Sequence, residues 1–241
     1  MPPVYIGIDD TDIAGSPGTN QLARRLADAL PNGCRTTLIL RHQLLFDPRV
    51  PFTSQNGSAS LLVESGDADA DARMLPILRR EIQAWYVAGS DPGLCAATNV
   101  EPAVIEFGRR CQRELVTQAE ARDLAERSGI RLEGLGGTED GVIGALAAVG
   151  LLASGDDGRV VHRPGWTWPD SFAGPQQIDA ILTRGVDEVR DSRSGERLER
   201  GSVDVGKHLR PALRAGRVVL FVEPASGSAG DAAAWRAVKL P

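Results

Sequence analysis

The chain has 241 residues, enough for one large domain or two small ones, and its 42% hydrophobic and 24% charged residues are ordinary for a soluble globular protein. With 27 Lys and Arg against 32 Asp and Glu, the net charge of -5 provides no general attraction to nucleic acid phosphates, so any RNA contact has to be local. Three cysteines without a Cys-x-x-Cys pair argue against a disulfide framework and a structural zinc site. Because we find neither a secretion signal nor an apolar run long enough for a bilayer, we expect a cytoplasmic protein without a membrane partner.

The most informative segment comes first in the chain. The apolar run Val4–Ile8 predicts a strand, and this strand ends on Asp9, Asp10, Thr11 and Asp12. Three carboxylates within four residues repel one another, so a fold that holds them together needs a cation, most simply Mg²⁺ with phosphate oxygens in its shell. We therefore predict that the three aspartates bind the metal and that the second and third take part in catalysis. The competing interpretation is an acidic turn whose side chains bond nearby backbone N–H groups.

A glycine-containing loop and a helix follow the aspartates. Residues 15–19, Gly-Ser-Pro-Gly-Thr, are flexible enough to let backbone amides approach an anion, so we predict a cofactor contact at Gly18. Thr19 can cap a helix that runs to about Leu30. Leucines at four-residue spacing define the buried face of this helix: Leu22, Leu26 and Leu30.

A long polar loop, residues 47–57, joins two predicted strands at 36–45 and 58–63. A loop of this length in a compact domain is often functional, so we predict that Arg41, His42 and Asn56 contact the substrate, although a lone histidine is more often structural. Further along, the patterns predict a helix ending at Trp85, a strand at 103–107, a helix opened by the capping box of Thr117 and Glu120, strands at 130–132 and 218–222, and a mobile linker at 225–232.

A second glycine-rich segment, residues 134–141, directly precedes an apolar stretch at 142–152 that reads as a buried helix. A glycine-rich turn that leads into a helix is an anion-binding arrangement, so it predicts nucleotide contacts. The segment lacks the Gly-Lys-Ser/Thr ending of a Walker A loop, and close backbone packing explains the glycines equally well. The predicted contact residues are Gly136, Gly137, Thr138 and Gly141.

Three separated motifs resemble those of the archaeal agmatinylcytidine synthetase family, which modifies an isoleucine tRNA. They are Gly7–Asp12 (GIDDTD), Leu45–Phe52 (LFDPRVPF) and Asp140–Gly150 (DGVIGALAAVG), and they occur in the family's order. The resemblance covers roughly residues 4–152, and three co-linear motifs are far more specific than any single one.

The resemblance implies an α+β fold with a kinase-like α/β domain, here residues 1–112, followed by a ferredoxin-like domain, residues 113–224, and a flexible linker and tail at 225–241. It also implies ATP and Mg²⁺ as cofactors: members phosphorylate a cytidine carbonyl and let agmatine displace the phosphate. By position, the resemblance puts Asp9, Asp10 and Asp12 at the metal and phosphate site. Thr19 falls in the segment where the family carries a threonine pair, one of which is autophosphorylated, and Asn20 takes the second position here. The resemblance therefore makes the Thr19 hydroxyl a candidate catalytic group.

The departures from the family concern contacts with RNA. A Lys-Thr-Arg-Gly-Asn-Gly pattern of the family is Thr-Ser-Gln-Asn-Gly-Ser at residues 53–58, and Asp140 stands where the family often has arginine. We also expect this sequence to lack the OB-fold and the zinc ribbon with which the archaeal enzymes grip tRNA. Together with the acidic balance, these differences weaken the expectation of a tRNA partner.

We therefore expect an ATP- and Mg²⁺-dependent phosphoryl-transfer enzyme that activates a carbonyl or amide oxygen for attack by an amine, with a nucleotide and a small-molecule amine as partners. The acceptor, RNA or small molecule, stays open. A second hypothesis is a haloacid-dehalogenase-like phosphatase in which Asp10 is the nucleophile and Asp12 the acid. A third is a non-catalytic nucleotide-binding regulatory module.

Overall fold

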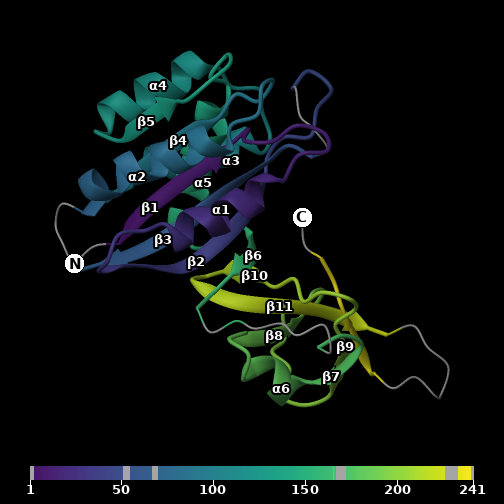
Figure 1. The fold of residues 1–241 in the computed structure, drawn as a ribbon. Helices are drawn as coiled ribbons and strands as arrows, with labels where there is room; N and C mark the ends of the chain where they lie inside the picture. Colours follow the sequence, from purple (N-terminus) through teal and green to yellow (C-terminus); the bar gives the residue numbers. More distant parts are fainter. Residues whose placement is uncertain are drawn as a thin grey trace. The chain divides into compact units, whose positions relative to one another are not determined.

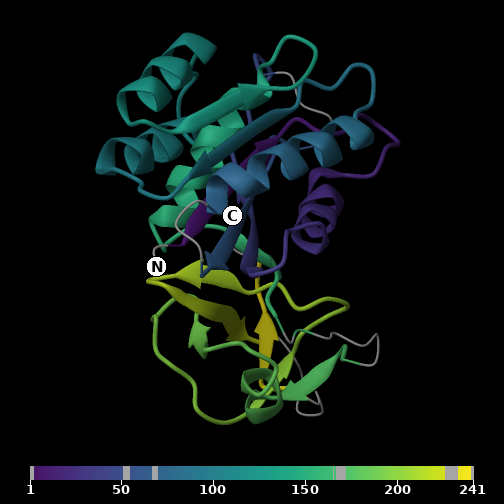
Figure 2. The same cartoon turned by 60° about the vertical axis from the view of Figure 1, so that its left-hand side comes forward.

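The chain folds into two compact units, Met1–Ser154 and Gly155–Pro241, in the computed structural model shown in Figures 1 and 2. The structure describes residues 3–50, 55–66, 70–164, 166, 172–225 and 233–239. Residues 226–232 of the predicted linker, and residues 51–54 of the predicted functional loop, lie outside the described residues.

The first unit is built on a five-stranded antiparallel sheet in the order β5-β4-β1-β3-β2. The central strand β1 pairs with β3 on one side and β4 on the other, so that Ile6 lies opposite both Leu61 and Ala96. This central position explains the apolar run that precedes the aspartates. The strands are β1 (Val4–Asp9), β2 (Cys34–Gln43), β3 (Gly57–Ser65), β4 (Gly93–Ala97) and β5 (Arg131–Gly134).

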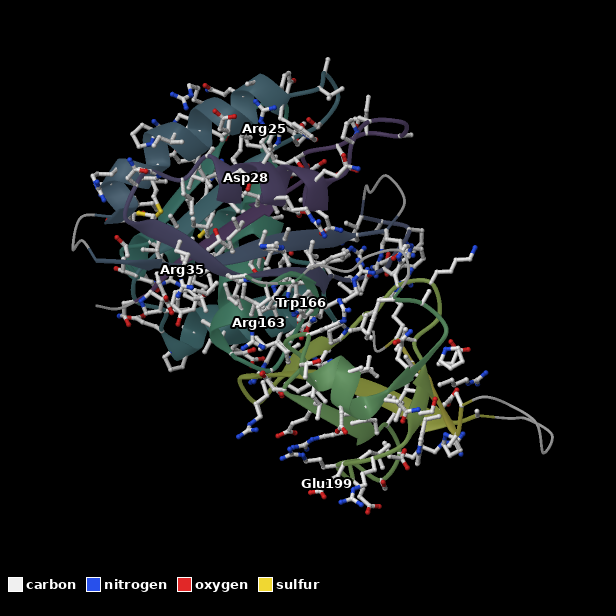
Figure 3. All side chains as sticks on the ribbon, turned by 60° about the horizontal axis from the view of Figure 1, so that its bottom comes forward. Arg25, Asp28, Arg35, Arg163, Trp166 and Glu199 are labelled. Atoms are coloured by element: carbon white, nitrogen blue, oxygen red, sulfur yellow. The ribbon has the colours of Figure 1, made fainter. Side chains whose placement is uncertain are left out.

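In the part of the first unit that the structure describes, helices cover both faces of this sheet: α1 (Thr19–Asp28), α2 (Ala70–Trp85), α3 (Pro102–Cys111), α4 (Gln118–Arg127) and α5 (Gly141–Ala153). Helices α1 and α2 lie on one face (Figure 2). Arg25 of α1, labelled in Figure 3, forms an ion pair of 2.9 Å with Glu81 of α2. Helices α3, α4 and α5 share one apolar core on the other face.

The first four strands and two helices follow the βαββαβ connectivity of a ferredoxin-like sheet, in the order β4-β1-β3-β2. This arrangement lies within the part of the chain for which we predicted the kinase-like domain. The predicted boundary at 112/113 also falls inside the first unit, because α5 contacts β1, β3 and β4 and completes their packing. A mixed α and β fold is confirmed, whereas the predicted division at residue 112 is replaced by one after Ser154.

Close backbone packing joins α5 to the sheet. A β-carbon on Gly7 would lie 2.0 Å from the carbonyl oxygen of Ala145, and one on Gly93 would lie 2.1 Å from that of Gly141. Since real β-carbons do not approach so closely, these positions require glycine. The packing brings the beginning of α5 beside the end of β1, where the aspartates lie.

Most predicted elements of the first unit are confirmed, including the capping box of Thr117 and Glu120 at the start of α4. The predicted strand at 103–107 is wrong, since these residues form part of helix α3. Pro102 stands at the start of that helix, and Val104, Phe107 and Cys111 are buried at spacings of three and four residues.

The second unit contains a sheet with pairings β6-β10-β11-β12-β9-β7, and β8 pairs in parallel with β11. Its core gathers Ile181, Val189, Leu220 and Val222, and its described residues hold one helix, of five residues, so the predicted ferredoxin-like domain at 113–224 is not confirmed. No helix in the described ranges is long and apolar enough to cross a membrane. The elements are β6 (Arg159–His162), β7 (Pro175–Gln177), α6 (Ile178–Leu182), β8 (Glu188–Asp191), β9 (Ser202–Asp204), β10 (Ala212–Arg214), β11 (Arg217–Pro224) and β12 (Trp235–Ala237).

Candidate functional site

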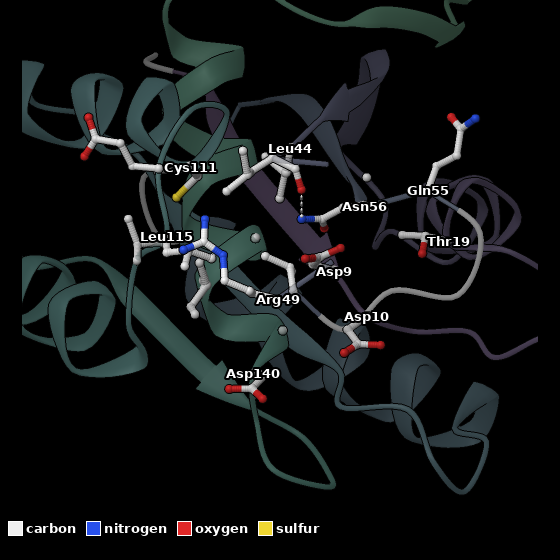
Figure 4. A pocket seen from close by; sticks show the side chains of 18 of the residues that line it. Asp9, Asp10, Thr19, Leu44, Arg49, Gln55, Asn56, Cys111, Leu115 and Asp140 are labelled. Carbon is white, nitrogen blue, oxygen red and sulfur yellow. Dashed lines mark hydrogen bonds between the residues drawn. The ribbon is translucent and has the colours of Figure 1, made fainter. Parts of the chain in front are cut away.

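A cavity of about 230 Å³ lies in the first unit, where β1 ends beside the start of α5 (Figure 4). One part of its wall is acidic and another is apolar. The acidic part consists of Asp9, Asp10, Asp12, Glu114 and Asp140, and the apolar part includes Leu44, Leu45, Leu115, Val116 and Ile143. Such a wall suits a ligand with a polar or charged group at one end and an apolar body at the other.

The backbone at the end of β1 directs two successive carboxylates toward the cavity. Adjacent side chains of a regular strand point to opposite faces of the sheet. Asp10 interrupts this alternation because its φ of 51° lies in the left-handed region, which non-glycine residues rarely adopt. As a result, Asp9 and Asp10 both line the cavity (Figure 4). Backbone strain of this kind occurs preferentially at functional sites.

The electrostatic environment disfavours the charged form of both carboxylates. Burial, together with the charge of Asp10, raises the pKa of Asp9 to about 7. Burial, together with the charge of Asp91, raises the pKa of Asp10 to about 6. Within the described ranges, no Lys or Arg forms an ion pair with either carboxylate, although Arg41 lies close enough for its charge to act on Asp9 and Asp12. A bound cation would stabilise the ionised carboxylates.

Asp12 holds the first turn of α1. Its Oδ1 accepts hydrogen bonds from the hydroxyl of Thr19 at 2.7 Å and from the backbone N–H of Thr19 at 3.2 Å. The Thr19 hydroxyl in turn accepts a bond of 3.1 Å from the hydroxyl of Thr11. Gly18, not Thr19, is the N-cap residue of α1. A β-carbon on Gly18 would lie 3.9 Å from Oδ2 of Asp12. The predicted catalytic threonine therefore lines the cavity as the first residue of the helix.

The predicted three-aspartate metal cluster is not formed. Among the residues that the structure describes, no group of three or more His, Cys, Asp or Glu side chains is arranged to hold a metal ion. The physical reason is the bonding of Asp12 to Thr19, which turns this carboxylate toward α1. Asp9 and Asp10 still fit Mg²⁺, which usually binds one or two carboxylates and fills its shell with water and substrate phosphates.

The second glycine-rich segment is mostly outside the cavity. The backbone N–H of Thr138 donates to Oδ1 of Asp91 at 2.5 Å, and a β-carbon on Gly136 would meet the ring of Tyr86 at 2.7 Å. Gly137 likewise faces the Asp91 carboxylate. Of the four nucleotide contacts predicted in this segment, Gly141 lines the cavity. The turn was predicted to bind phosphate through its backbone amides, but the N–H of Thr138 already donates to Asp91.

The three predicted substrate contacts have different positions. Asn56 lines the cavity, and its side-chain amide donates to the carbonyl of Leu45 at 2.8 Å, so it fastens the polar loop. The guanidinium of Arg41 lies against Gly57, where a β-carbon would be only 2.6 Å from its Nη2. His42 is fully buried in the sheet, with Nε2 2.7 Å from the hydroxyl of Ser60, and it is not among the residues that line the cavity.

Several residues of this site were missed by sequence reasoning. Arg49 lines the cavity and forms an ion pair with Asp47, with Nη2 and Oδ2 2.8 Å apart. Asp140 was noted as a departure from a family motif, but not as a wall residue. Asp91 lies far from the N-terminal aspartates in the chain, and the pairing of Asp9 with Gly93 in the sheet brings it close. The apolar residues of the wall could not be predicted, because a leucine or valine that lines a cavity cannot be distinguished in the sequence from one in a hydrophobic core.

The fold and cavity thus define an α and β protein with an acidic site at the end of a central strand. No protein-family model matches the sequence, and no curated protein matches it. Solved structures do match. A tRNA fluorescent labeling enzyme aligns with a TM-score of 0.52 and 24% identity over 61% of this chain and 36% of that chain.

Two structures of TiaS, an agmatidine synthetase for an isoleucine tRNA, also match. The apo enzyme aligns with a TM-score of 0.52 and 23% identity over 61% of this chain and 35% of the enzyme. The complex of TiaS with its isoleucine tRNA and ATP aligns with a TM-score of 0.56 and 21% identity over 76% of this chain and 44% of the enzyme. This chain therefore spans less than half the length of the proteins it matches, and the predicted resemblance is confirmed at the level of the fold.

Proposed function

We propose that this protein is an ATP- and Mg²⁺-dependent phosphoryl-transfer enzyme of the TiaS type. In this proposal it phosphorylates a carbonyl or amide oxygen of an acceptor, and an amine then displaces the phosphate. The acceptor is a tRNA or a smaller molecule with the same functional group. The fold shared with a tRNA- and ATP-bound TiaS supports the proposal. The observation that carries it is the pair Asp9 and Asp10, two carboxylates of raised pKa that line one cavity.

Three residues of the acidic wall, Asp9, Asp10 and Asp12, have a role in this proposal. Asp9 and Asp10 hold Mg²⁺, which offsets the negative charge of the transferred phosphoryl group when it is bound. Thr19 and Asp12 form a hydroxyl–carboxylate pair at 2.7 Å, in which the carboxylate can accept the hydroxyl proton. The apolar wall around Leu44 and Ile143 excludes water from one side of the cavity.

The test is ATP binding and hydrolysis with and without Mg²⁺, with the products resolved as ADP or AMP. We expect Asp10→Asn to weaken the Mg²⁺-dependent part of ATP binding by about tenfold or more, since one of two carboxylate ligands is lost. The matched control is Asp204→Asn in the second unit, which should leave binding unchanged. Unchanged Mg²⁺-dependent binding in Asp10→Asn would remove the aspartates from the active site and overturn the proposal.

The same assay separates the two alternative functions. A phosphatase of the haloacid-dehalogenase type would form a phosphoaspartate on Asp10 and hydrolyse simple phosphate esters without a nucleotide. No lysine lines the described wall of the cavity, which leaves this alternative without its usual cationic partner. A regulatory module would bind ATP tightly and release no phosphate, pyrophosphate or AMP.

A further inference from the structure

Asp91 connects the two sides of the acidic wall through two hydrogen bonds and an electrostatic interaction with Asp10. Its side-chain Oδ1 accepts the backbone N–H of Thr138 at 2.5 Å, and its carbonyl oxygen accepts the backbone N–H of Gly141 at 3.0 Å. Its backbone and its charge also lie close enough to the carboxylate of Asp10 to act on the pKa of that group. One residue thus contacts the end of β1, the glycine-rich turn and the first residue of α5.

The glycine-rich turn is shaped around the Asp91 carboxylate. Gly137 has a φ of 60°, and a β-carbon there would lie 1.8 Å from Oδ1 of Asp91, so the carboxylate occupies the space that a side chain would need. The next residue, Thr138, donates its hydroxyl to Asp140 at 3.0 Å. The carboxylate of Asp140 lines the cavity. The contacts therefore run from Asp91 through the turn to the cavity wall.

We propose that Asp91 is a positioning residue of the cavity: it fastens the turn at 136–141 to the end of β1 and so fixes Asp10 and Asp140 in the wall. The proposal rests on the proposed function, in which Asp10 is a metal ligand. Residues that orient metal ligands through hydrogen bonds typically change metal affinity by about 10–100-fold when they are removed. A merely local turn bond would have no such effect on the ligand.

The closest structural alternative is an ordinary turn in which an aspartate accepts a nearby amide. Asp204 provides such a turn, since its Oδ1 accepts the backbone N–H of Gly206 at 2.9 Å in the second unit. The two aspartates differ in what they hold. Asp204 bonds an amide two residues away, whereas Asp91 bonds amides of a segment that is remote in the chain. Asp204→Ala is therefore the matched control.

The experiment compares Asp91→Ala with Asp91→Asn, in which the amide oxygen can still accept the Thr138 N–H. Amide hydrogen exchange followed by NMR reports on the turn, and the ratio of ATP affinities with and without Mg²⁺ reports on Asp10. We expect Asp91→Ala to speed exchange at Thr138 about tenfold or more and to reduce the Mg²⁺-dependent gain in ATP affinity about tenfold. We expect Asp91→Asn to stay within about threefold of the wild type in both measurements.

A second variant reaches the same contact from the other side, in case Asp91→Ala fails to fold. Gly137→Ala puts a β-carbon against the Asp91 carboxylate and should reproduce both effects. Faster exchange with an unchanged Mg²⁺ effect, or unchanged exchange in Asp91→Ala, would overturn the positioning role. A wild-type protein that binds no ATP would instead overturn the proposed function, while the exchange comparison would still decide whether Asp91 fastens the turn.

Discussion

The carboxylate of Asp9 lies directly over the backbone of Gly144 in α5. A β-carbon on Gly144 would be only 1.7 Å from Oδ2 of Asp9, so the absence of a side chain on the helix is what gives this carboxylate its place. Glycine at position 144 of α5 therefore makes room for the Asp9 carboxylate, in addition to any role in packing the helix on the sheet.

Gly144→Ala should displace the Asp9 carboxylate while preserving the fold. The group that must move is the end of a side chain, so we expect a loss of stability of about 1–3 kcal/mol together with a tenfold or greater loss of Mg²⁺-dependent ATP binding. Urea unfolding and isothermal titration measure the two effects. Gly150→Ala is the control on the same helix, because its β-carbon would meet the backbone oxygen of Val104 at 2.1 Å, away from the cavity. Equal losses of binding in the two variants would contradict this account.

Asp9→Asn should change how stability depends on pH. The native pKa of Asp9 is about 7, against an ordinary value of 3.8, so between these values the native state binds more protons than the unfolded state. The contribution of Asp9 to stability is therefore greatest below about pH 4 and falls as the pH rises toward about 7. Asparagine does not titrate, so we expect the variant to gain stability relative to the wild type between pH 5 and pH 8. Unfolding curves at both pH values, with Asp123→Asn as control, test this; parallel pH profiles would refute it.

Asn56→Ala should loosen the polar loop beside the cavity. The side-chain amide of Asn56 donates to the carbonyl of Leu45 at 2.8 Å, and its loss leaves this partly buried carbonyl without that donor. We expect a loss of about 1–2 kcal/mol in the free energy of unfolding. Gln55→Ala, which removes a longer bond of 3.4 Å to Arg41 at an exposed position, should cost less than about 0.5 kcal/mol. Similar losses for the two variants would argue against the fastening role of Asn56.

His42→Leu separates a structural histidine from a substrate contact. The substitution keeps an apolar body in the sheet but leaves the buried hydroxyl of Ser60 without its partner, so we expect a loss of about 1–3 kcal/mol in stability. ATP affinity of the folded protein should stay within about twofold of the wild type, because the histidine does not reach the cavity. A strong loss of affinity at unchanged stability would restore the substrate role that the sequence suggested.

The sequence predicted those parts of the first unit whose information is local. The leucine spacing marked α1, the capping box of Thr117 and Glu120 marked α4, and the carboxylates at the end of β1 marked the site. Strand β4, Gly93–Ala97, was missed because its small residues have little strand propensity, and its pairing with β1 and β5 decides its conformation.

The parts of the site that could not be predicted depend on contacts between distant segments. Nothing near Asp91 in the sequence indicates that its carboxylate accepts the amide of Thr138, because this contact exists only once β4 pairs with β1 and α5 packs on the sheet. Conversely, the glycine-rich turn suggested an anion site from its composition alone, although its amide already has an internal acceptor. The local sequence was enough to predict which charged residues matter, whereas the strand pairing and helix packing determine which of them line the same cavity.

At Asp10, the left-handed backbone conformation lowers stability, while the carboxylate is needed for the proposed metal binding. Glycine, and to a lesser degree asparagine, adopts this conformation at lower cost, so either would favour the native state while removing the charge. A variant library selected for heat resistance alone should therefore enrich Gly and Asn at position 10, and the enriched proteins should be robust but unable to handle nucleotides. Under the proposed function, the aspartate at this position keeps a metal-binding charge at the expense of thermal stability.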